Sequence, residues 1–299
     1  MELRHLRYFI AVANERNFTR AAELLNIAQP PLSRQIRQLE DNVGSELFDR
    51  TSRPLKLTEV GRLFYEHATN VLAGLDQLQA LMSQMAGAGR RRFVIGFVGS
   101  TLYGHLPAVI RRFRACASHV DVSLLECSTV EQIAALKEGR IDVGFGRLRI
   151  EDQAIRRIVL AEEPLVAVVP AGHALTRVGR PLRLVDFLSE SLIVYPRPAR
   201  PSYADHILSV FHDLGLVPGP LTEVRELQTA IGLVAAHAGL SIVPESVQRL
   251  RRDDVCYLPI AERGALSPIM MIHRAGDISG ELEALIGISC ELHAGGARA

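Results

Sequence analysis

The sequence predicts an α/β protein in three parts: a helix-turn-helix segment at the N-terminus, one long helix, and a larger C-terminal region. Two short helical patterns separated by a tight turn occupy residues 17–39. An apolar residue then recurs every three or four positions from Phe64 to Met85, which is typical of a long helix. From Phe93 onward, short runs rich in β-branched residues alternate with helical stretches, as in α/β domains.

The two short helices of residues 17–39 are separated by residues that cannot continue a helix. Phe18–Leu25 has small and apolar residues at helical spacing, and Asn26 suits its end because asparagine tolerates left-handed backbone. Proline is accepted at the start of a helix, so a second helix is expected to begin near Pro31. Its buried face is marked by apolar residues at i, i+4 and i+7, which are Leu32, Ile36 and Leu39. An earlier helix is expected from the apolar stripe of residues 3–13.

Two such helices would place the N-terminal residues of the second one at the base edges of a DNA major groove. Arginine, glutamine and serine side chains there can bond to bases or phosphates. The candidate DNA-binding residues of this segment are Gln29, Pro30, Pro31, Ser33, Arg34 and Arg37. A helical hairpin with a solvated basic face fits the spacing alone equally well, because short motif matches are hypotheses.

The loop after the second helix predicts a short hairpin, the wing of a winged helix. Apolar pairs flank the polar stretch Asp49–Pro54, and Arg53 at its tip could reach a minor groove or a phosphate. An ordinary exposed loop arginine is the alternative. The net charge of the chain is only +1, and residues 1–60 contain nine Arg or Lys against eight Asp or Glu. Contact with DNA must therefore depend on where the basic side chains lie rather than on total charge.

The long helix is expected to begin after Thr58, which can cap it, with Glu59 in the first turn opposing the helix dipole. Its apolar positions follow steps of four and three residues: Phe64, Ala68, Val71, Leu75, Leu78, Met82 and Met85. A heptad seam of this kind favours a two-helix coiled coil and hence a dimer, while packing within the same chain is the alternative. Gly87–Gly89 would end the helix and is a hinge candidate.

The region after Phe93 predicts a mostly parallel sheet, because strands and helices alternate. The expected helices are Leu102–Arg114, Val130–Glu138, Tyr203–Leu214, Leu227–Ala238 and Gly280–His293. Two strands end in Ser-Thr followed by a helix, at Ser100 and at Ser128, and a third polar helix start lies near Ser202. Helix N-termini attract carboxylate and phosphate groups, and open α/β sheets bind ligands at the carboxyl ends of their strands. A small diacid bridging two such starts would fit, although serine and threonine also cap helices without any ligand.

Other function classes leave little trace in the sequence. There is no P-loop, nucleophile elbow or dinucleotide-binding glycine pattern, and the ten histidines and four cysteines show no metal spacing. We therefore expect no enzyme activity, no metal and no cofactor. The chain has no apolar run long enough for a membrane span and no signal-peptide core, so a cytoplasmic protein is expected. A thiol redox sensor is the alternative, because Cys127 lies beside a proposed ligand strand.

The N-terminal region resembles that of the LysR-type transcriptional regulators. The resemblance is carried by RHLRYFIAVANERNFTRAAELL, IAQPPLSRQIRQLED, LFDR and LKLTEVGRLF. It implies a winged helix-turn-helix DNA-binding domain over residues 1–58 and a linker and dimerisation helix over 59–89. Family members form tetramers on promoter DNA and act with RNA polymerase, so these partners are expected as well.

The resemblance extends over the C-terminal region, which is similar to the effector-binding domain of the same family over residues 90–299. That domain is built like a periplasmic binding protein, with two α/β lobes flanking a cleft. The resemblance implies that lobe I comprises residues 90–161 and 267–299 and lobe II residues 162–266. The chain would then cross between the lobes near Leu160–Pro164 and return near Leu266–Ile269.

Several motifs resemble those of LysR-type activators of catechol and benzoate breakdown, which sense cis,cis-muconate or chlorinated muconates. These motifs are STLYG, ALKEGRIDVGFGR, RPSYADHI, ELQTAIGLVA and SIVPESV. The family's effector residues fall on Ser100, Thr129, Pro201, Ser202, Tyr203 and Ile269. Arg147 is a further candidate to balance a carboxylate, and a surface salt bridge is its alternative. Some relatives bind a second aromatic acid with a C-terminal tyrosine; this chain has His293 and no tyrosine there, which argues against a second site.

Overall fold

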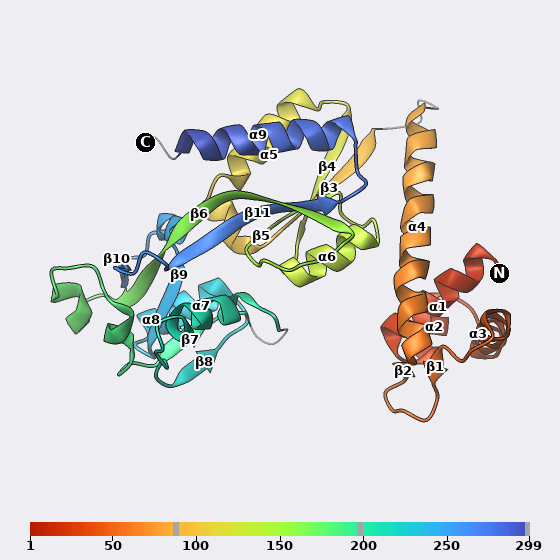
Figure 1. Ribbon diagram of the computed structural model, residues 1–299, viewed down its shortest axis with the longest axis horizontal. Helices are drawn as coiled ribbons and strands as arrows, with labels where there is room; N and C mark the ends of the chain where they lie inside the picture. The colour runs from red at the N-terminus through yellow and green to blue at the C-terminus, as the bar shows by residue number, and fades with distance from the viewer. Residues whose placement is uncertain (86–89, 197–199, 297–299) are drawn as a thin grey trace. The chain divides into compact units, whose positions relative to one another are not determined.

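The computed structural model describes residues 1–85, 90–196 and 200–296, so the hinge predicted at Gly87–Gly89 lies outside the described residues. The chain forms a first compact unit made mainly of Met1–Arg91 and a second made of Arg92–Leu136 and Ile141–Ala299. Figure 1 shows the helical first unit and the sheet of the second. None of the described helices combines the length and the apolar character needed to span a bilayer.

The first unit begins with three helices whose ends follow from local chemistry. These are α1 (Leu3–Glu15), α2 (Phe18–Leu24) and α3 (Gln29–Val43). The Asn17 side chain caps α2 by accepting from the backbone N–H of Thr19 at 2.8 Å. Asn26 has a φ of +53°, the left-handed backbone expected for the turn. Helix α3 begins at Gln29, two residues before the expected position, so both prolines lie in its first turn.

The core of the first unit joins these helices to a two-stranded wing. The wing consists of β1 (Phe48–Asp49) and β2 (Lys56–Leu57), which pair antiparallel. The buried ring of Phe9 lies 5.1 Å from that of Phe48, centroid to centroid. Glu40 on α3 is also buried, and its Oε1 accepts from the backbone N–H of Leu47 at 2.9 Å while its Oε2 pairs with Arg50. These contacts fix the base of the wing against α3.

The predicted long helix is α4 (Glu59–Met85), and its heptad seam divides into two parts. Thr58 Oγ1 accepts from the backbone N–H of Gly61 at 2.9 Å and caps the helix as expected. Early seam positions pack into the core of the same unit, where Ala68 is buried. Later positions are more than half exposed: Val71 at 52%, Leu78 at 55% and Met82 at 57%. The early seam positions thus pack within the same chain, and dimerisation through the later positions stays a prediction.

The second unit is built on one nine-stranded sheet among the described residues, in the order β4-β3-β5-β11-β6-β9-β7-β8 with β10 on β6. The strands are β3 (Arg91–Phe97), β4 (Val120–Glu126), β5 (Val143–Gly146), β6 (Ile155–Pro170), β7 (Leu192–Val194), β8 (Leu221–Glu223), β9 (Leu240–Pro244), β10 (Val255–Pro259) and β11 (Leu266–Arg274). The α-helices are α5 (Leu106–Cys116), α6 (Thr129–Lys137), α7 (Tyr203–His212), α8 (Leu227–Ala235) and α9 (Gly280–Gly296). Short 3-10 helices are η1 (Gly99–Tyr103), η2 (Ala174–Arg177), η3 (Leu184–Phe187) and η4 (Glu245–Leu250).

The sheet is mixed, which corrects the expectation of a mostly parallel sheet. Strands β3 and β5 pair in parallel, as do β7 with β8 and β9. The two long strands β6 and β11 pair antiparallel, from Ile155 opposite Arg274 to Pro164 opposite Leu266. Strand β6 then continues antiparallel against β9 and β10. These crossing strands join two lobes, and the expected crossings at residues 160–164 and 266–269 fall within their paired stretch. The expected helix at Leu102–Arg114 is divided into η1 and α5.

Helices cover both faces of the sheet in the first lobe. Helices α5 and α9 pack on one face over a core that includes Phe93, Phe113 and Leu285, and α6 lies on the other face over Val94 and Ile272 (Figure 1). A separate core fills the second lobe beneath α7 and α8.

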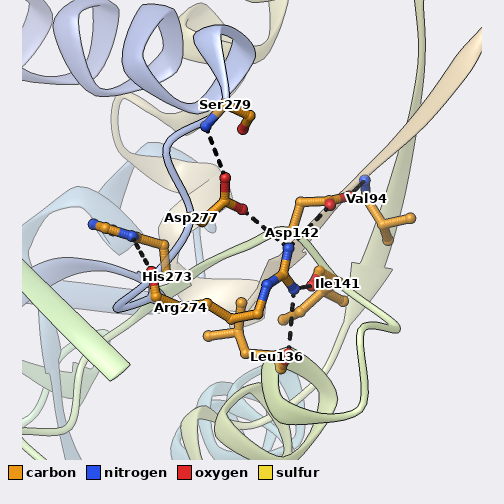
Figure 2. Close-up of polar contacts among 8 residues, drawn as sticks. All are labelled: Val94, Leu136, Ile141, Asp142, His273, Arg274, Asp277 and Ser279. Carbon is orange, nitrogen blue, oxygen red and sulfur yellow. Dashed lines mark hydrogen bonds and ion pairs between the residues drawn. The ribbon is translucent and has the colours of Figure 1, made fainter. Parts of the chain in front are cut away.

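A polar network at the end of β11 holds the C-terminal end of α6. Arg274 Nη1 donates to the backbone oxygen of Leu136 at 3.2 Å and to that of Ile141 at 2.7 Å (Figure 2). Its Nη2 donates to Asp277 at 3.0 Å, and the Asp277 carboxylate accepts from the backbone N–H of Ser279 at the start of α9. Helix α6 is thus anchored at the end opposite to Thr129.

Candidate ligand cavity and nucleic-acid interface

A cavity of about 470 Å³ lies between the two lobes of the second unit. Its volume falls within the range usual for small-molecule sites. Residues from η1 and from the starts of α6, α7 and α8 line it. Three helix N-termini therefore meet one cavity, and each brings backbone N–H groups and a partial positive charge.

Arg147 holds the hydroxyl groups that the first lobe contributes. It follows β5 directly, and the residue is 2% exposed. Arg147 Nε donates to Ser100 Oγ at 2.9 Å, and the backbone N–H of Arg147 donates to Thr129 Oγ1 at 3.4 Å. Because each hydroxyl oxygen accepts one of these bonds, its own hydrogen is directed elsewhere and is left to donate to a ligand.

The charge of Arg147 is neutralised within the protein. Its Nη2 donates to Glu163 Oε2 at 2.7 Å and its Nη1 donates to Ser267 Oγ at 2.9 Å. Glu163 on β6 is 9% exposed and also accepts from the backbone N–H of Ser246. The alternative interpretation of Arg147 as a surface salt-bridge residue is wrong, because both partners are buried. Arg147 lines the cavity, but attraction for an anion must come mainly from the helix N-termini and hydroxyl groups.

The second lobe contributes Pro201, Ser202 and Tyr203 to the cavity wall. The backbone N–H of Ser202 donates to Asp205 Oδ2 at 2.7 Å, which fixes the first turn of α7. Ser202 Oγ is buried and finds no hydrogen-bond partner in the part of the chain that the structure describes. A buried hydroxyl without a partner is costly, so a ligand that reached this group would gain a favourable contact.

Two tyrosines lie beside this helix start as neutral hydrogen-bonding groups. Burial raises the pKa of Tyr203 to about 12 and raises the pKa of Tyr195 well above its ordinary value. Their ring centroids are 5.7 Å apart. Both side chains therefore stay protonated at any physiological pH and add no negative charge to the cavity.

One predicted ligand residue is not brought to this cavity. Ile269 is buried in β11 opposite Ala161, and it is not among the described residues that line the cavity. Ser100, Thr129, Arg147, Pro201, Ser202 and Tyr203 do line it.

Sequence reasoning missed several cavity residues, namely Glu126, Tyr195, Arg225, Glu226 and Gln228. Glu126, Arg225, Glu226 and Gln228 are exposed, so their charges are screened by water. The pairing of Arg147 with Glu163 was missed too. The sequence did carry one indication of this pair, since the acidic Glu163 directly precedes the apolar run of β6. A carboxylate in a buried strand needs a charged or hydrogen-bonding partner.

The candidate DNA-binding residues gather at the start of α3 and at the wing tip. Gln29, Pro30, Pro31, Arg34 and Arg37 are exposed, and Ser33 is half-buried. Gln29 Nε2 donates to Ser33 Oγ at 2.8 Å, which orders the first turn. Arg53 is exposed in the wing turn, where the Asp49 carboxylate accepts from the hydroxyls of Thr51 and Ser52. These hydrogen bonds lower the pKa of Asp49 to about 2.

Comparison with known proteins assigns both parts of the chain. A family model described as bacterial regulatory helix-turn-helix protein, lysR family, matches residues 3–62. A second, described as LysR substrate binding domain, matches residues 86–289. The chain belongs to the LysR family. It is a DNA-binding transcriptional regulator rather than an enzyme.

Individual relatives match this LysR-type regulator over most of their length. It is 51% identical over 282 residues to the regulator CatR of Pseudomonas putida, covering 93% of this chain and 95% of CatR. It is 48% identical over 279 residues to a probable cat1 operon transcriptional activator of Acinetobacter lwoffii, covering 93% of this chain and 92% of that activator. The effector-binding domain of BenM, solved with its effector benzoate, aligns at a TM-score of 0.66 and 38% identity, covering 70% of this chain and 94% of that one. BenM is a regulator of Acinetobacter baylyi.

The regulator's cysteine and histidine side chains bear on metal and second-ligand sites. The described residues contain no group of three or more His, Cys, Asp or Glu side chains that could hold a metal ion. His293 is buried on α9, and its Nδ1 bonds to the backbone oxygen of Ser289 at 2.7 Å. Its ring lies 4.9 Å from that of His105, and burial lowers its pKa. Of the four cysteines, Cys127 is the one among the described cavity residues.

Proposed function

We propose that this LysR-type regulator activates genes for catechol or benzoate breakdown in response to cis,cis-muconate or a chlorinated muconate. Residues 1–58 form its DNA-binding domain, residues 59–89 its linker and dimerisation helix, and residues 90–299 its effector-binding domain. The resemblance to a cat1 operon activator and to BenM supports the gene class. In this account the protein acts in the cytoplasm as a tetramer that contacts promoter DNA and RNA polymerase.

The observation that carries the effector proposal is the convergence of three helix N-termini and several hydroxyl groups on one cavity. A diacid has a carboxylate at each end, and a buried carboxylate without partners is costly. Ser100, Thr129 and the first turn of α6 would hold one carboxylate from the first lobe. Ser202, Tyr203 and the first turn of α7 would hold the other from the second lobe. Binding would thus favour one arrangement of the lobes, alter the spacing of the DNA-binding domains and change DNA bending.

Loss of a cavity hydroxyl is expected to weaken effector binding. Ser100→Ala and Thr129→Ala should each reduce the affinity for cis,cis-muconate by about ten- to hundredfold, since a hydrogen bond to a charged group contributes roughly 1.5–3 kcal/mol. Calorimetric titration of the full-length protein measures this. Ser209→Ala, which removes an exposed hydroxyl outside this cavity, should bind like the unmutated protein. If the double variant Ser100→Ala/Thr129→Ala also binds muconate normally, the effector lies elsewhere.

Loss of a base contact is expected to weaken promoter binding. Arg34 is exposed near the start of α3, and Arg34→Ala should cost about 1–3 kcal/mol and relax the preference at one base pair. Fluorescence anisotropy with promoter fragments that differ at single positions measures both effects. Arg111→Ala removes the same charge from an exposed position on α5 and serves as the control. Equal affinity of the Arg34 variant and the unmutated protein would refute the role of α3 in base recognition.

A further inference from the structure

Three side chains connect the two lobes at an exposed edge of the ligand cavity. Gln228 Nε2 on α8 donates to the hydroxyl of Tyr103 on η1 at 3.0 Å. Arg249 Nη1 on η4 donates to the backbone oxygen of Tyr103 at 2.9 Å and to that of Gly104 at 3.4 Å. Tyr103 belongs to the first lobe, whereas Gln228 and Arg249 belong to the second. We call these three residues the clasp.

The clasp is joined directly to the ligand-binding groups. Tyr103 and Ser100 occupy the same five-residue 3-10 helix, which is closed by Thr101 Oγ1 donating to the backbone oxygen of Val98 at 2.7 Å. Gln228 lies in the first turn of α8 and lines the cavity. A bond between Tyr103 and Gln228 therefore holds the segment that carries Ser100 against the second lobe.

Further polar contacts between the lobes lie near the crossing strands. The carboxylate of Glu163 on β6 joins Arg147 of the first lobe to Ser246 of the second. Arg149 of the first lobe also pairs with Glu162 at the start of the second lobe. The Arg147–Glu163 contact lies at the crossing strands, whereas the clasp joins η1 of the first lobe to α8 and η4 of the second and would break if the lobes opened.

We infer that the clasp of Tyr103, Gln228 and Arg249 keeps the lobes in their ligand-binding arrangement and thereby sets the affinity for the effector. The inference rests on the proposed function of the cavity. The clasp stabilises the same closed arrangement as an effector that is held by both lobes. Breaking the clasp therefore lowers the population of the closed state and, with it, the apparent affinity for the effector. Tyr103 and Arg249 are then positioning residues that act without touching the effector.

The test compares variants of the full-length protein by calorimetric titration with cis,cis-muconate. Tyr103→Phe removes the hydroxyl that accepts from Gln228, and Arg249→Met removes both backbone contacts. Each should weaken muconate binding about two- to tenfold, the effect of one ordinary hydrogen bond. Two matched controls should bind normally. Tyr257→Phe deletes a buried hydroxyl without a partner among the described residues, and Arg263→Met removes an exposed charge from the second lobe.

A second readout needs no ligand. Hydrogen exchange of the backbone amides of residues 99–104 and 226–230 should become faster in Tyr103→Phe and Arg249→Met but not in the controls. Unchanged exchange would show that the clasp does not hold the lobes, and faster exchange with unchanged muconate affinity would show that it does not govern binding. Either result overturns the inference. If the unmutated protein binds no muconate while exchange responds as described, the clasp stands as a closing device and the proposed effector is wrong.

Discussion

Glu163→Ala should destabilise the effector-binding unit by about 3–5 kcal/mol, because it leaves the buried Arg147 guanidinium without its carboxylate partner. The backbone N–H of Ser246 would lose its acceptor as well. Urea unfolding of the full-length protein, followed by circular dichroism, measures the loss.

The neighbouring carboxylate provides a close control for this prediction. Glu162 pairs with Arg149, but the two side chains are 35% and 58% exposed. Glu162→Ala should therefore cost less than about 1 kcal/mol. Removing both buried charges in Arg147→Met/Glu163→Met should recover most of the stability lost in Glu163→Ala. Equal unfolding midpoints for the Glu162 and Glu163 variants would show that the buried pair is not the source of stability.

Leu78→Glu should abolish the dimer and, with it, tight promoter binding. Leu78 is 55% exposed within its own chain, so a second copy can cover it, and the substitution would place two facing carboxylates in the seam. Promoter affinity should fall because two linked α3 helices are needed to read two half-sites. Light scattering coupled to size exclusion measures the mass. Arg62→Glu, roughly 160° around α4 from Leu78 at 3.6 residues per turn, should leave the mass unchanged. A Leu78 variant of unaltered mass would remove α4 from the dimer interface.

Features determined by neighbouring residues were predictable from the sequence. Asn26 adopts left-handed backbone, Thr58 caps α4 and proline lies in the first turn of α3, although this helix begins two residues earlier than expected. Each of these features depends on local backbone chemistry. The cavity positions of Ser100 and Thr129 were predictable for the same reason. A strand that runs directly into a polar helix start can be recognised from a few neighbouring residues.

Features that join distant segments could not be predicted from the sequence. Periodicity shows that β6 is a strand but not that it pairs antiparallel with β11 and β9, so the sheet was expected to be mostly parallel. The bond of Gln228 to Tyr103 spans 125 positions of sequence, and no local pattern marks it. The placement of Ile269 at the ligand came from resemblance alone. Ile269 is buried in β11 and is not among the described residues that line the cavity, so its role stays a prediction.

A diacid bound in the cavity should change how the protein holds promoter DNA. The most direct measurement is energy transfer between dyes at the two ends of a promoter fragment bound by the full-length protein, as cis,cis-muconate is added. Energy transfer should change saturably with muconate for the unmutated protein and stay constant for Ser100→Ala/Thr129→Ala. A constant signal from the unmutated protein at every muconate concentration, with the DNA still bound, would show that muconate does not change the arrangement of the bound promoter.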